Sequence, residues 1–237
     1  MRYQHLFSEI QNHSVDSPET AYARRKAAQW ILAVCSTPFS MHSEMFDCIQ
    51  WICGDLRSLL EGVERQTAGL RGRAEKDAHQ AVKEVLGRSS RRYSGECDDL
   101  LDVHPCLSMC FVEQIQCMCR EVSESDEMSS AESYSVARQE LGRVFGIDED
   151  CVTICEFIFI VQNFTEVESY FEDFLGVFKF GSRRLLAHML GMSQGRLNCC
   201  LKELCRFGIL ESAYGSSLRL SGPILEFWSS ERIDIDT

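Results

Sequence analysis

The stretch RRLLAHMLGMSQGRLNCCLKELCRFGILE, residues 183–211, decides how the C-terminal part of this chain folds. Gly191 and Gly208 each follow a run whose apolar residues recur every three or four positions, and glycine commonly ends a helix. Ser193, a favoured N-cap residue, precedes the second run. The pattern predicts two helices joined by a glycine-containing turn, a helix-turn-helix. The positions predicted to face inward are Leu186, Ala187, Leu190, Met192, Leu197, Leu201, Leu204, Ile209 and Leu210.

The residues that follow the second helix predict a small β-hairpin. Two short apolar runs flank YGSS at 214–217, as expected of two strands and the turn between them. PILEFW at 223–228 then begins a closing helix. Helix, turn, helix and hairpin in this order make a winged helix, which we place at about residues 177–230.

The net charge of −12 is unevenly distributed along the chain. Residues 1–95 hold 13 basic and 11 acidic side chains, residues 96–175 hold 3 and 19, and residues 176–237 hold 8 and 6. The three net charges are therefore +2, −16 and +2, so the acidity belongs to the middle of the chain. The predicted winged helix lies outside that acidic segment.

The second helix of the winged helix presents a polar face opposite its leucines. DNA-binding helices place such a face in the major groove. From Phe180 to Gly222 there are six basic and two acidic residues, a net charge of +4 that favours DNA. If the acidic segment lay beside this face it would repel phosphates, so duplex DNA and a protein partner both stay open. The residues predicted to bind one or the other are Arg183, Arg184, Gln194, Arg196, Asn198, Lys202, Arg206 and Arg219.

The sequence predicts an all-α protein of two parts, apart from the small β-hairpin. Residues 1–122 are expected to form a helical bundle, and residues 134–237 a helical region that ends in the winged helix. Between them, residues 123–133 read SESDEMSSAES, an acidic and serine-rich composition typical of a linker.

Within the N-terminal bundle, the apolar spacing predicts one long helix that begins at Ser40. Its apolar positions recur every three or four residues from Met45 to Val63. An exposed polar loop is expected at residues 87–96, which read GRSSRRYSGE. The helix after that loop should break or restart at Pro105, because proline disrupts a helix interior.

Thirteen cysteines are many for a chain of this length, but their setting indicates reduced thiols. The first residues lack the apolar segment of a secretory signal, and no apolar run approaches the roughly 18 residues of a membrane span. A cytoplasmic protein without a membrane span is therefore expected. C-x-x-C motifs are absent, which favours core packing over zinc binding even in the densest cluster, and neither a metal nor a cofactor is predicted. That cluster is Cys97, His104, Cys106, Cys110, Cys117 and Cys119.

The run VQNFTEVESYFEDFLGVFKFGSRRLLAHMLGMSQGRLNCCLKELCRFGILE, from Val161 to Glu211, resembles a region that precedes the ATPase core of certain bacterial AAA-type ATPases. There an acidic, aromatic helix like SYFEDFLG leads into a helix-turn-helix like RRLLAHMLGMSQGRL. The resemblance covers about 50–80 of the 237 residues. It implies that the chain is an accessory N-terminal portion whose ATP site belongs to a following domain. The chain has no GxxxxGK[ST] phosphate loop, so no nucleotide-binding residue is carried over and no ATP hydrolysis is predicted.

The sequence therefore predicts a non-catalytic binding or adaptor module. It contains no HExxH and no glycine-rich dinucleotide turn, and its GxSxG match, Gly191 to Gly195, falls in the predicted turn between two helices and not after a strand, so no catalytic residue is predicted. The partner would be another protein or the following ATPase domain. The alternative is an autonomous winged-helix transcriptional regulator that binds duplex DNA and dimerises through its N-terminal helices.

Overall fold

Helices account for most of the described chain, in agreement with the predicted all-α class. The computed structural model describes residues 18–37, 41, 43–88, 93–124, 131–175, 180–212 and 218–225. The N-terminal elements are α2 (Pro18–Cys35), α3 (Ser43–Cys53), α4 (Leu56–Thr67), α5 (Arg73–Gly87), α6 (Tyr93–Val103), the 3-10 helix η1 (Pro105–Leu107) and α7 (Ser108–Glu124). The C-terminal elements are α8 (Ala131–Phe145), α9 (Glu149–Asn163), α10 (Thr165–Leu175), α11 (Phe180–Met189), α12 (Gln194–Arg206), β1 (Leu210–Ser212) and β2 (Leu218–Leu220).

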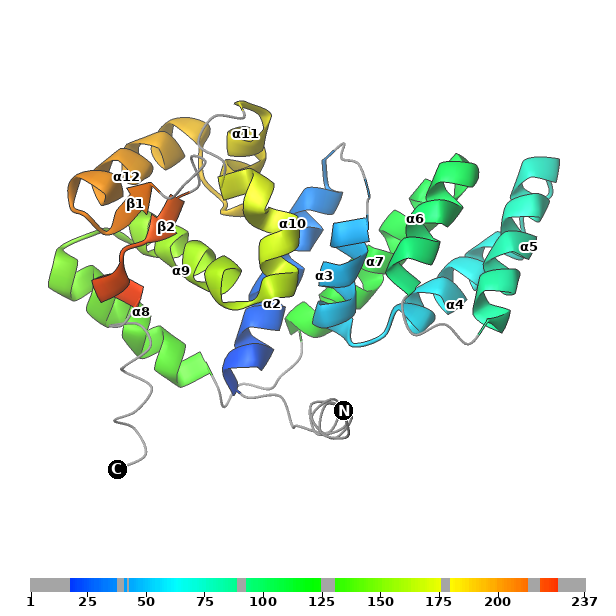
Figure 1. Ribbon diagram of the computed structural model, residues 1–237, viewed down its shortest axis with the longest axis horizontal. Coiled ribbons are helices and arrows are strands. Elements are labelled where there is room, and N and C mark those ends of the chain that lie inside the picture. The colour runs from blue at the N-terminus through cyan, green and yellow to red at the C-terminus, as the bar shows by residue number, and fades with distance from the viewer. Residues whose placement is uncertain are drawn as a thin grey trace, which may run out of the picture.

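The helices form an elongated array (Figure 1). α5 lies at one end with α4 and α6 beside it, whereas α8, α12 and the two strands lie at the other end. In the middle, α2 packs along α7 and also contacts α8 and α11, and α10 packs on α3. Helices from both halves of the chain therefore meet in the centre of the molecule.

One hydrophobic core runs through both halves. Trp30 of α2 packs edge-on against Phe157 of α9 and Phe171 of α10, with ring centroids 4.7 and 5.8 Å away. Trp51 of α3 lies 5.0 Å from the ring of Phe164, which separates α9 from α10. These contacts join the two parts that the sequence separates by a linker, and the predicted domain boundaries stay a prediction.

α9 is buried on almost all sides. Its residues from Cys151 to Val161 are buried except for Thr153, and a helix that is apolar all round belongs inside a protein. Asp148 caps its start by accepting a hydrogen bond from the backbone N–H of Cys151 at 3.1 Å. No helix in the described ranges has both the length and the apolar character that crossing a membrane requires.

The single long helix predicted from Ser40 is wrong, because the chain forms two helices, α3 and α4. Gly54 separates them with φ +79°, a left-handed conformation that favours glycine. Asp55 then caps α4 by accepting from the backbone N–H groups of Arg57 and Ser58, at 2.7 and 3.3 Å. Apolar residues keep a helical spacing across this turn, which is why the spacing alone suggested one helix. Ser40 itself lies outside the described residues.

Other predicted boundaries shift by a few residues. The polar loop predicted at 87–96 is shorter, because α6 begins at Tyr93, whose side chain is buried. The linker predicted at 123–133 overlaps the ends of its neighbours, since α7 continues to Glu124 and α8 begins at Ala131. The break at Pro105 is confirmed, because α6 ends before this proline and the 3-10 helix begins with it.

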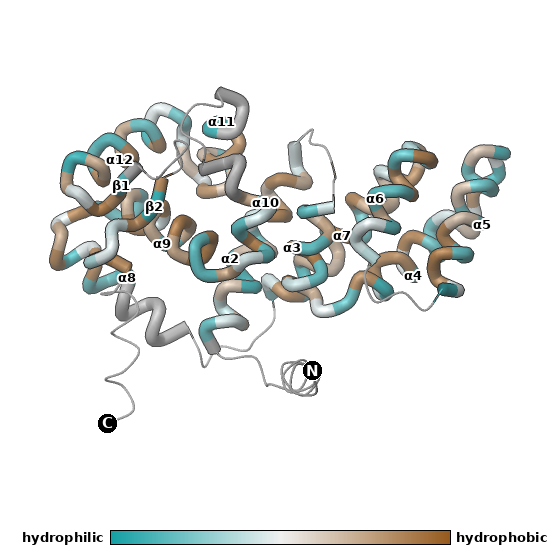
Figure 2. The backbone as a smooth tube through the Cα atoms, viewed as in Figure 1, coloured by the Kyte–Doolittle hydropathy of each residue, from teal (hydrophilic) through white to brown (hydrophobic). Residues whose placement is uncertain are grey.

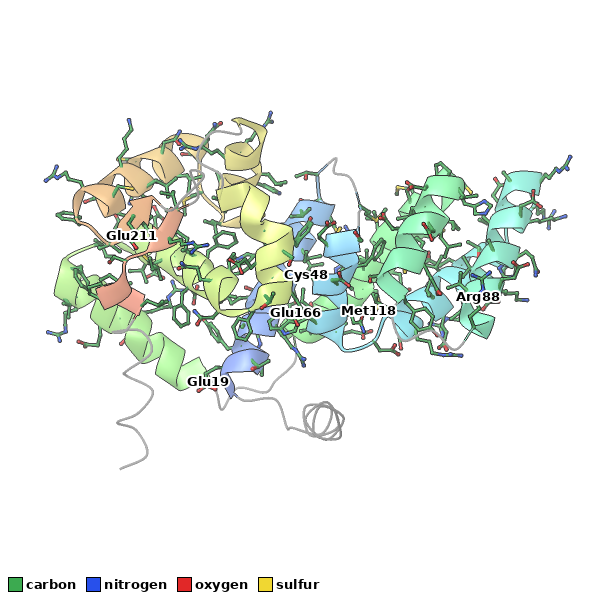
Figure 3. All side chains as sticks on the ribbon, in the orientation of Figure 1. Glu19, Cys48, Arg88, Met118, Glu166 and Glu211 are labelled. Carbon is green, nitrogen blue, oxygen red and sulfur yellow. The ribbon has the colours of Figure 1, made fainter. Side chains whose placement is uncertain are left out.

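Side chains fill the spaces between the helices (Figure 3). Hydrophobic and hydrophilic residues alternate along α4, α5 and α12 (Figure 2), as expected of helices that bury one side. α3 and α10 meet near Cys48 and Glu166, which Figure 3 labels. Burial raises the pKa of the Cys48 thiol, and Cys53 and then the Glu166 carboxylate raise it further.

Candidate functional site at the surface of α11 and α12

Two glycines end α11 and α12, as the sequence predicts. Gly191 has φ +70° and Gly208 has φ +68°. In each case this N–H and the next one bond back to carbonyls in the last turn of the helix, which is the Schellman pattern. Ser193 caps α12 by accepting a hydrogen bond from the backbone N–H of Arg196 at 3.1 Å. The two helices are therefore held at a defined turn by local backbone chemistry.

The apolar side of the two helices faces the rest of the protein. α12 packs on α9 and α11, and α11 packs on α2 and α10. The nine positions predicted to face inward are all buried or half-buried, with Leu190 and Met192 the two half-buried ones. The opposite side of α12 is consequently the side that faces solvent.

β1 and β2 form the antiparallel pair that the sequence predicts after α12. Leu210 pairs with Leu220 and both are buried, whereas Glu211 pairs with Arg219 and both are exposed. The backbone N–H of Leu220 donates to Oε1 of Gln162, which fixes β2 against α9 at 3.1 Å. The predicted YGSS turn and the part of PILEFW beyond residue 225 lie outside the described residues.

The N-terminal end of α12 is paired with the N-terminal end of α9. The guanidinium of Arg196 contacts a carboxylate oxygen of Asp148, and its Nε lies 2.6 Å from Oδ2 of Asp150. The Arg196 guanidinium and the N–H of Cys151 together hold the pKa of Asp148 below its usual range. Arg196, one of the predicted contact residues, therefore already has two partners within the chain.

Three more of the predicted contact residues also lie beside groups of the same chain. Nη1 of Arg183 donates to Oδ1 of Asn198 at 2.8 Å, which links α11 to α12. Arg219 stands directly opposite Glu211 in the hairpin, and opposite charges in such cross-strand positions attract. These three side chains are therefore less available to a partner than the sequence alone suggests.

Three of the other four predicted contact residues lie on open surface. Gln194 is half-buried, whereas Arg184, Lys202 and Arg206 are exposed. Lys202 and Arg206 stand one turn apart on α12, and neither has an ion-pair partner within the described part of the chain. Phe207 follows them with 49% of its surface exposed, and the guanidinium carbon of Arg206 lies 5.5 Å from its ring centroid. Phe207 is not among the residues predicted to contact a partner, although its place directly before Gly208, at the end of the predicted helix, is a usable signal.

Two cysteines meet beneath the paired end of α12. Cys200 of α12 and Cys151 of α9 are both fully buried, and their Sγ atoms lie within 4.8 Å of each other. Burial raises the pKa of both thiols above the ordinary value. Cys200 is not among the predicted site residues, and its burial follows from its place on the leucine side of α12. The neighbouring Cys199 is exposed.

Glu156 forms a buried charged cluster at the junction of α2, α8 and α9. It is 1% exposed and accepts a hydrogen bond from the Tyr22 hydroxyl. Lys26 Nζ lies 3.2 Å and Arg138 Nη1 lies 2.7 Å from its Oε2. Burial and the Glu156 carboxylate raise the pKa of Tyr22, so the hydroxyl keeps its proton. This cluster is not predicted from the sequence, where a single acid inside a largely apolar run was the available signal.

The cysteines of the 97–119 segment separate in the fold. Cys97 and Cys119 are buried in the core, whereas Cys106 and Cys117 are exposed. Cys119 instead meets Cys53 of α3, and the hydrogen bond between them lowers the pKa of Cys53 and raises that of Cys119. The segment therefore does not gather its thiols and His104 around one point.

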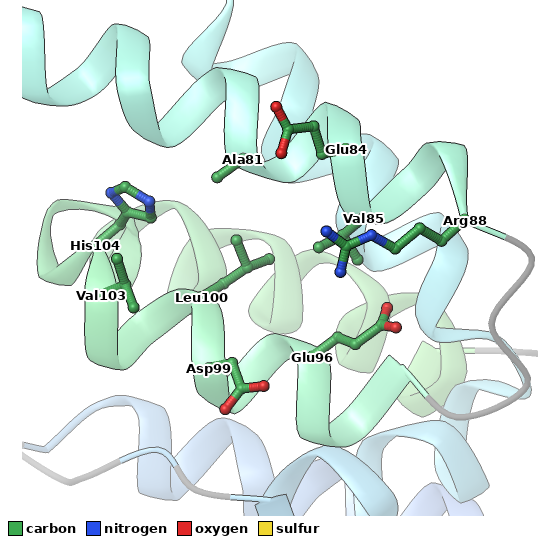
Figure 4. A pocket seen from close by; sticks show the side chains of 9 residues that line it. All are labelled: Ala81, Glu84, Val85, Arg88, Glu96, Asp99, Leu100, Val103 and His104. Atoms are coloured by element: carbon green, nitrogen blue, oxygen red, sulfur yellow. The ribbon is translucent and has the colours of Figure 1, made fainter.

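A pocket of about 220 Å³ lies between α5 and α6, far from α12 (Figure 4). Arg88 and Glu96 reach toward each other at one end of it, and His104 lies at the other end. Oε2 of Glu96 is buried and has no hydrogen-bond partner within the described chain. The volume is below the range of about 300–1,000 Å³ that is usual for ligand pockets. Its remaining lining residues are Ala81, Glu84, Val85, Asp99, Leu100 and Val103.

No protein-family model, curated protein or solved structure matches this chain significantly.

Proposed function

We propose that this chain is a non-catalytic docking module in which α11, α12, β1 and β2 form a winged helix that binds a protein partner. The order helix, turn, helix and antiparallel hairpin supports this fold. The resemblance of the run from Val161 to Glu211 to the region before the ATPase core of bacterial AAA-type ATPases makes such an ATPase domain the first partner to test.

The ion pairs of Arg196 with Asp148 and Asp150 carry the proposal. In helix-turn-helix proteins that read DNA, the N-terminal residues of the second helix contact base edges. Arg196 is the third residue of α12, and its guanidinium already bonds to two carboxylates. The two acids stand beside the helix end that would approach the phosphates, and phosphate attraction supplies much of DNA affinity. This end of α12 is therefore better suited to protein contact than to DNA.

The other end of α12 has the composition of a protein-binding surface. Lys202 and Arg206 are exposed there beside the half-exposed ring of Phe207. Arginine and aromatic residues are enriched where proteins meet, and they often supply most of the binding energy. We infer a partner surface that offers acidic side chains around an apolar pocket.

Duplex DNA is the second candidate, because the net charge of +4 between Phe180 and Gly222 favours it. Arg184, Lys202 and Arg206 are exposed and could meet phosphates. In this alternative Asp148 and Asp150 would weaken binding by repulsion.

The protein-partner proposal is tested with a purified AAA-type ATPase domain encoded in the same genome, preferably in the same or an adjacent reading frame. Isothermal titration calorimetry should detect binding, and Phe207→Ala or Lys202→Glu should each weaken it by about tenfold or more. Asp98→Asn on α6, far from α12, is the matched control and should leave the affinity unchanged. Absence of binding to any such domain would count against this partner.

The DNA alternative is tested by fluorescence anisotropy with a labelled duplex of mixed sequence. At about 150 mM salt we expect a dissociation constant weaker than about 10⁻⁶ M, within the usual non-specific range of about 10⁻⁴–10⁻⁶ M. Micromolar or tighter binding that falls steeply with salt and disappears in Arg196→Ala would replace the partner proposal with DNA binding. The double variant Asp148→Asn/Asp150→Asn would then bind more tightly than Asp98→Asn/Asp99→Asn, which changes the net charge equally at a distant place.

A further inference from the structure

Asp148, Cys151 and Cys200 bring three metal-ligand atoms together where α9 meets α12. A carboxylate oxygen of Asp148 and the two Sγ atoms all lie within 4.8 Å of one another. Among the residues that the structure describes, this is the one group of three or more His, Cys, Asp or Glu side chains placed in this way. Two of the residues belong to the start of α9 and one to α12, so the fold assembles the group.

The fold holds the three side chains in place without a metal ion. Oδ1 of Asp148 accepts the N–H of Cys151 at 3.1 Å, which fixes the carboxylate relative to the first turn of α9. Cys200 lies on the leucine side of α12 and is fully buried, as is Cys151. Asp148 is exposed, so one side of the group opens toward solvent. An ion could therefore enter past the carboxylate and meet two thiols that are already in position.

A second thiol pair in the same protein shows what the carboxylate adds. Cys53 and Cys119 are likewise neighbours, since each thiol shifts the pKa of the other. No carboxylate or imidazole of the described chain joins that pair at comparable distance. Two thiols in contact are thus explained by core packing alone, whereas two thiols with a carboxylate supply a ligand set.

We propose that Asp148, Cys151 and Cys200 bind a zinc ion, with a water molecule as the fourth ligand. Zinc takes thiolate sulfur at about 2.3 Å and carboxylate oxygen at about 2.0–2.2 Å in a tetrahedron, which sets the ligand atoms about 3.5–3.8 Å apart. The three atoms therefore need to move by no more than about 1 Å. Thiolates favour zinc over magnesium and calcium, which prefer oxygen ligands. Binding releases the two thiol protons to the buffer.

Arg196 supplies the charge that this ligand set requires. Two thiolates and one carboxylate carry three negative charges, of which a zinc ion offsets two. The Arg196 guanidinium contacts Asp148 and offsets part of the third, because it is shared with Asp150. Groups that hold a metal ligand by hydrogen bonds in this manner orient it and tune its affinity. The ion would fasten α12 to α9, and this role does not depend on which partner α12 binds.

The test uses the full chain, purified under reducing conditions and stripped of metal with a chelator. Zinc is added in competition with a chromogenic chelator, and we expect one equivalent to bind per chain. Cys151→Ser and Cys200→Ser should each weaken binding by about 100-fold or more, and Asp148→Asn by about 10-fold or more. Cys199→Ser, which changes the exposed neighbour, is the matched control and should bind like the original chain.

Cobalt provides a readout that a merely destabilised variant cannot imitate. Cobalt bound by thiolates absorbs in the near ultraviolet through sulfur-to-metal charge transfer, and this band should disappear in Cys151→Ser/Cys200→Ser while the circular dichroism of the helices persists. The proposal is overturned if less than a tenth of an equivalent of zinc binds, if the double variant binds as tightly as the original, or if mass spectrometry of the reduced preparation shows a Cys151–Cys200 disulfide.

Discussion

Two charged contacts of α9 differ in burial, one in the middle of the helix and one at its exposed start. In the middle, Glu156 is 1% exposed and bonds to groups of α2 and α8. At the start, Asp148 and Asp150 keep nearly half of their side-chain surface exposed while they pair with Arg196 of α12. The same kind of ion pair therefore serves as a fixed part of the core at one place and as an exchangeable contact at the other.

Burial explains the difference between the two contacts. A charge inside a protein loses its hydration, so removing one partner leaves the other uncompensated at high cost. A charge at the surface regains water when its partner leaves, and exposed pairs contribute little. The contact around Glu156 should therefore be essential for stability, whereas the contact of Arg196 can open when a partner takes its place.

The largest effect is expected from Glu156→Ala. Removing this carboxylate leaves the half-buried Lys26 without its acid and the half-buried Arg138 with the exposed Glu149 alone, and we expect a loss of roughly 3–5 kcal/mol in the free energy of unfolding, measured by urea denaturation. Glu149→Ala is the matched control, because Glu149 also pairs with Arg138 but has 76% of its side chain exposed. The free energy of unfolding should fall by less than about 1 kcal/mol in Glu149→Ala. Equal losses in the two variants would show that burial does not distinguish the two contacts.

A smaller effect is expected when the backbone between α11 and α12 is strained. Gly191 has φ +70° with open space around the position of a Cβ atom, so Gly191→Ala meets only backbone strain. This should cost about 1–2 kcal/mol. Gly195→Ala, inside α12 and also without a close neighbour, should instead stabilise the protein by up to about 1 kcal/mol. Melting curves that shift in the same direction for both variants would contradict the assigned turn.

Arg196→Ala should change the global stability only slightly, because the pair is at the surface. We expect the melting temperature to move by no more than a few degrees. Hydrogen exchange should nevertheless become faster in the first turns of α9 and α12, where the contact is lost. Lys202→Ala, which removes an unpaired charge from the same helix, should leave that exchange unaltered. A large drop in melting temperature would mean that the pair is structural.

The smallest effect is expected on acidification. The pKa of Asp148 in the folded chain is lowered by Arg196 and by the N–H of Cys151. Its contribution is therefore complete above the unfolded value of about 3.9 and is lost as the pH falls through the lower folded value. Amide chemical shifts of α12 followed from about pH 5 down to about pH 2 should show this loss. Asp148→Asn should abolish this pH-dependent change in chemical shift. A change that persists in the variant would belong to another titrating group.

Features that depend on neighbours in the sequence could be predicted, and features that depend on distant residues could not. The ends of α11 and α12 follow from Gly191, Ser193 and Gly208, each of which acts on its own turn. The break at Gly54 was missed because apolar spacing continues across it, although the dipeptide of Gly54 and Asp55 carried a local signal.

The site was only partly predictable for the same reason. Helix periodicity places five of the eight predicted contact residues on the outer side of α12, but it does not show what lies against them. Arg196 meets acids 46 and 48 positions earlier in the chain. No local pattern indicates that meeting, nor the meeting of Cys200 with Cys151 or of Glu156 with Tyr22.

The aromatic contacts in the middle of the molecule give it an intrinsic optical reporter. Trp30 and Trp51, the two tryptophans that the structure describes, pack against Phe157, Phe171 and Phe164 from the other half of the chain. If the halves separated while their helices stayed folded, both indoles would enter water and their fluorescence would shift to longer wavelength. Emission spectra could then follow the association of the halves independently of helix content, without any added label.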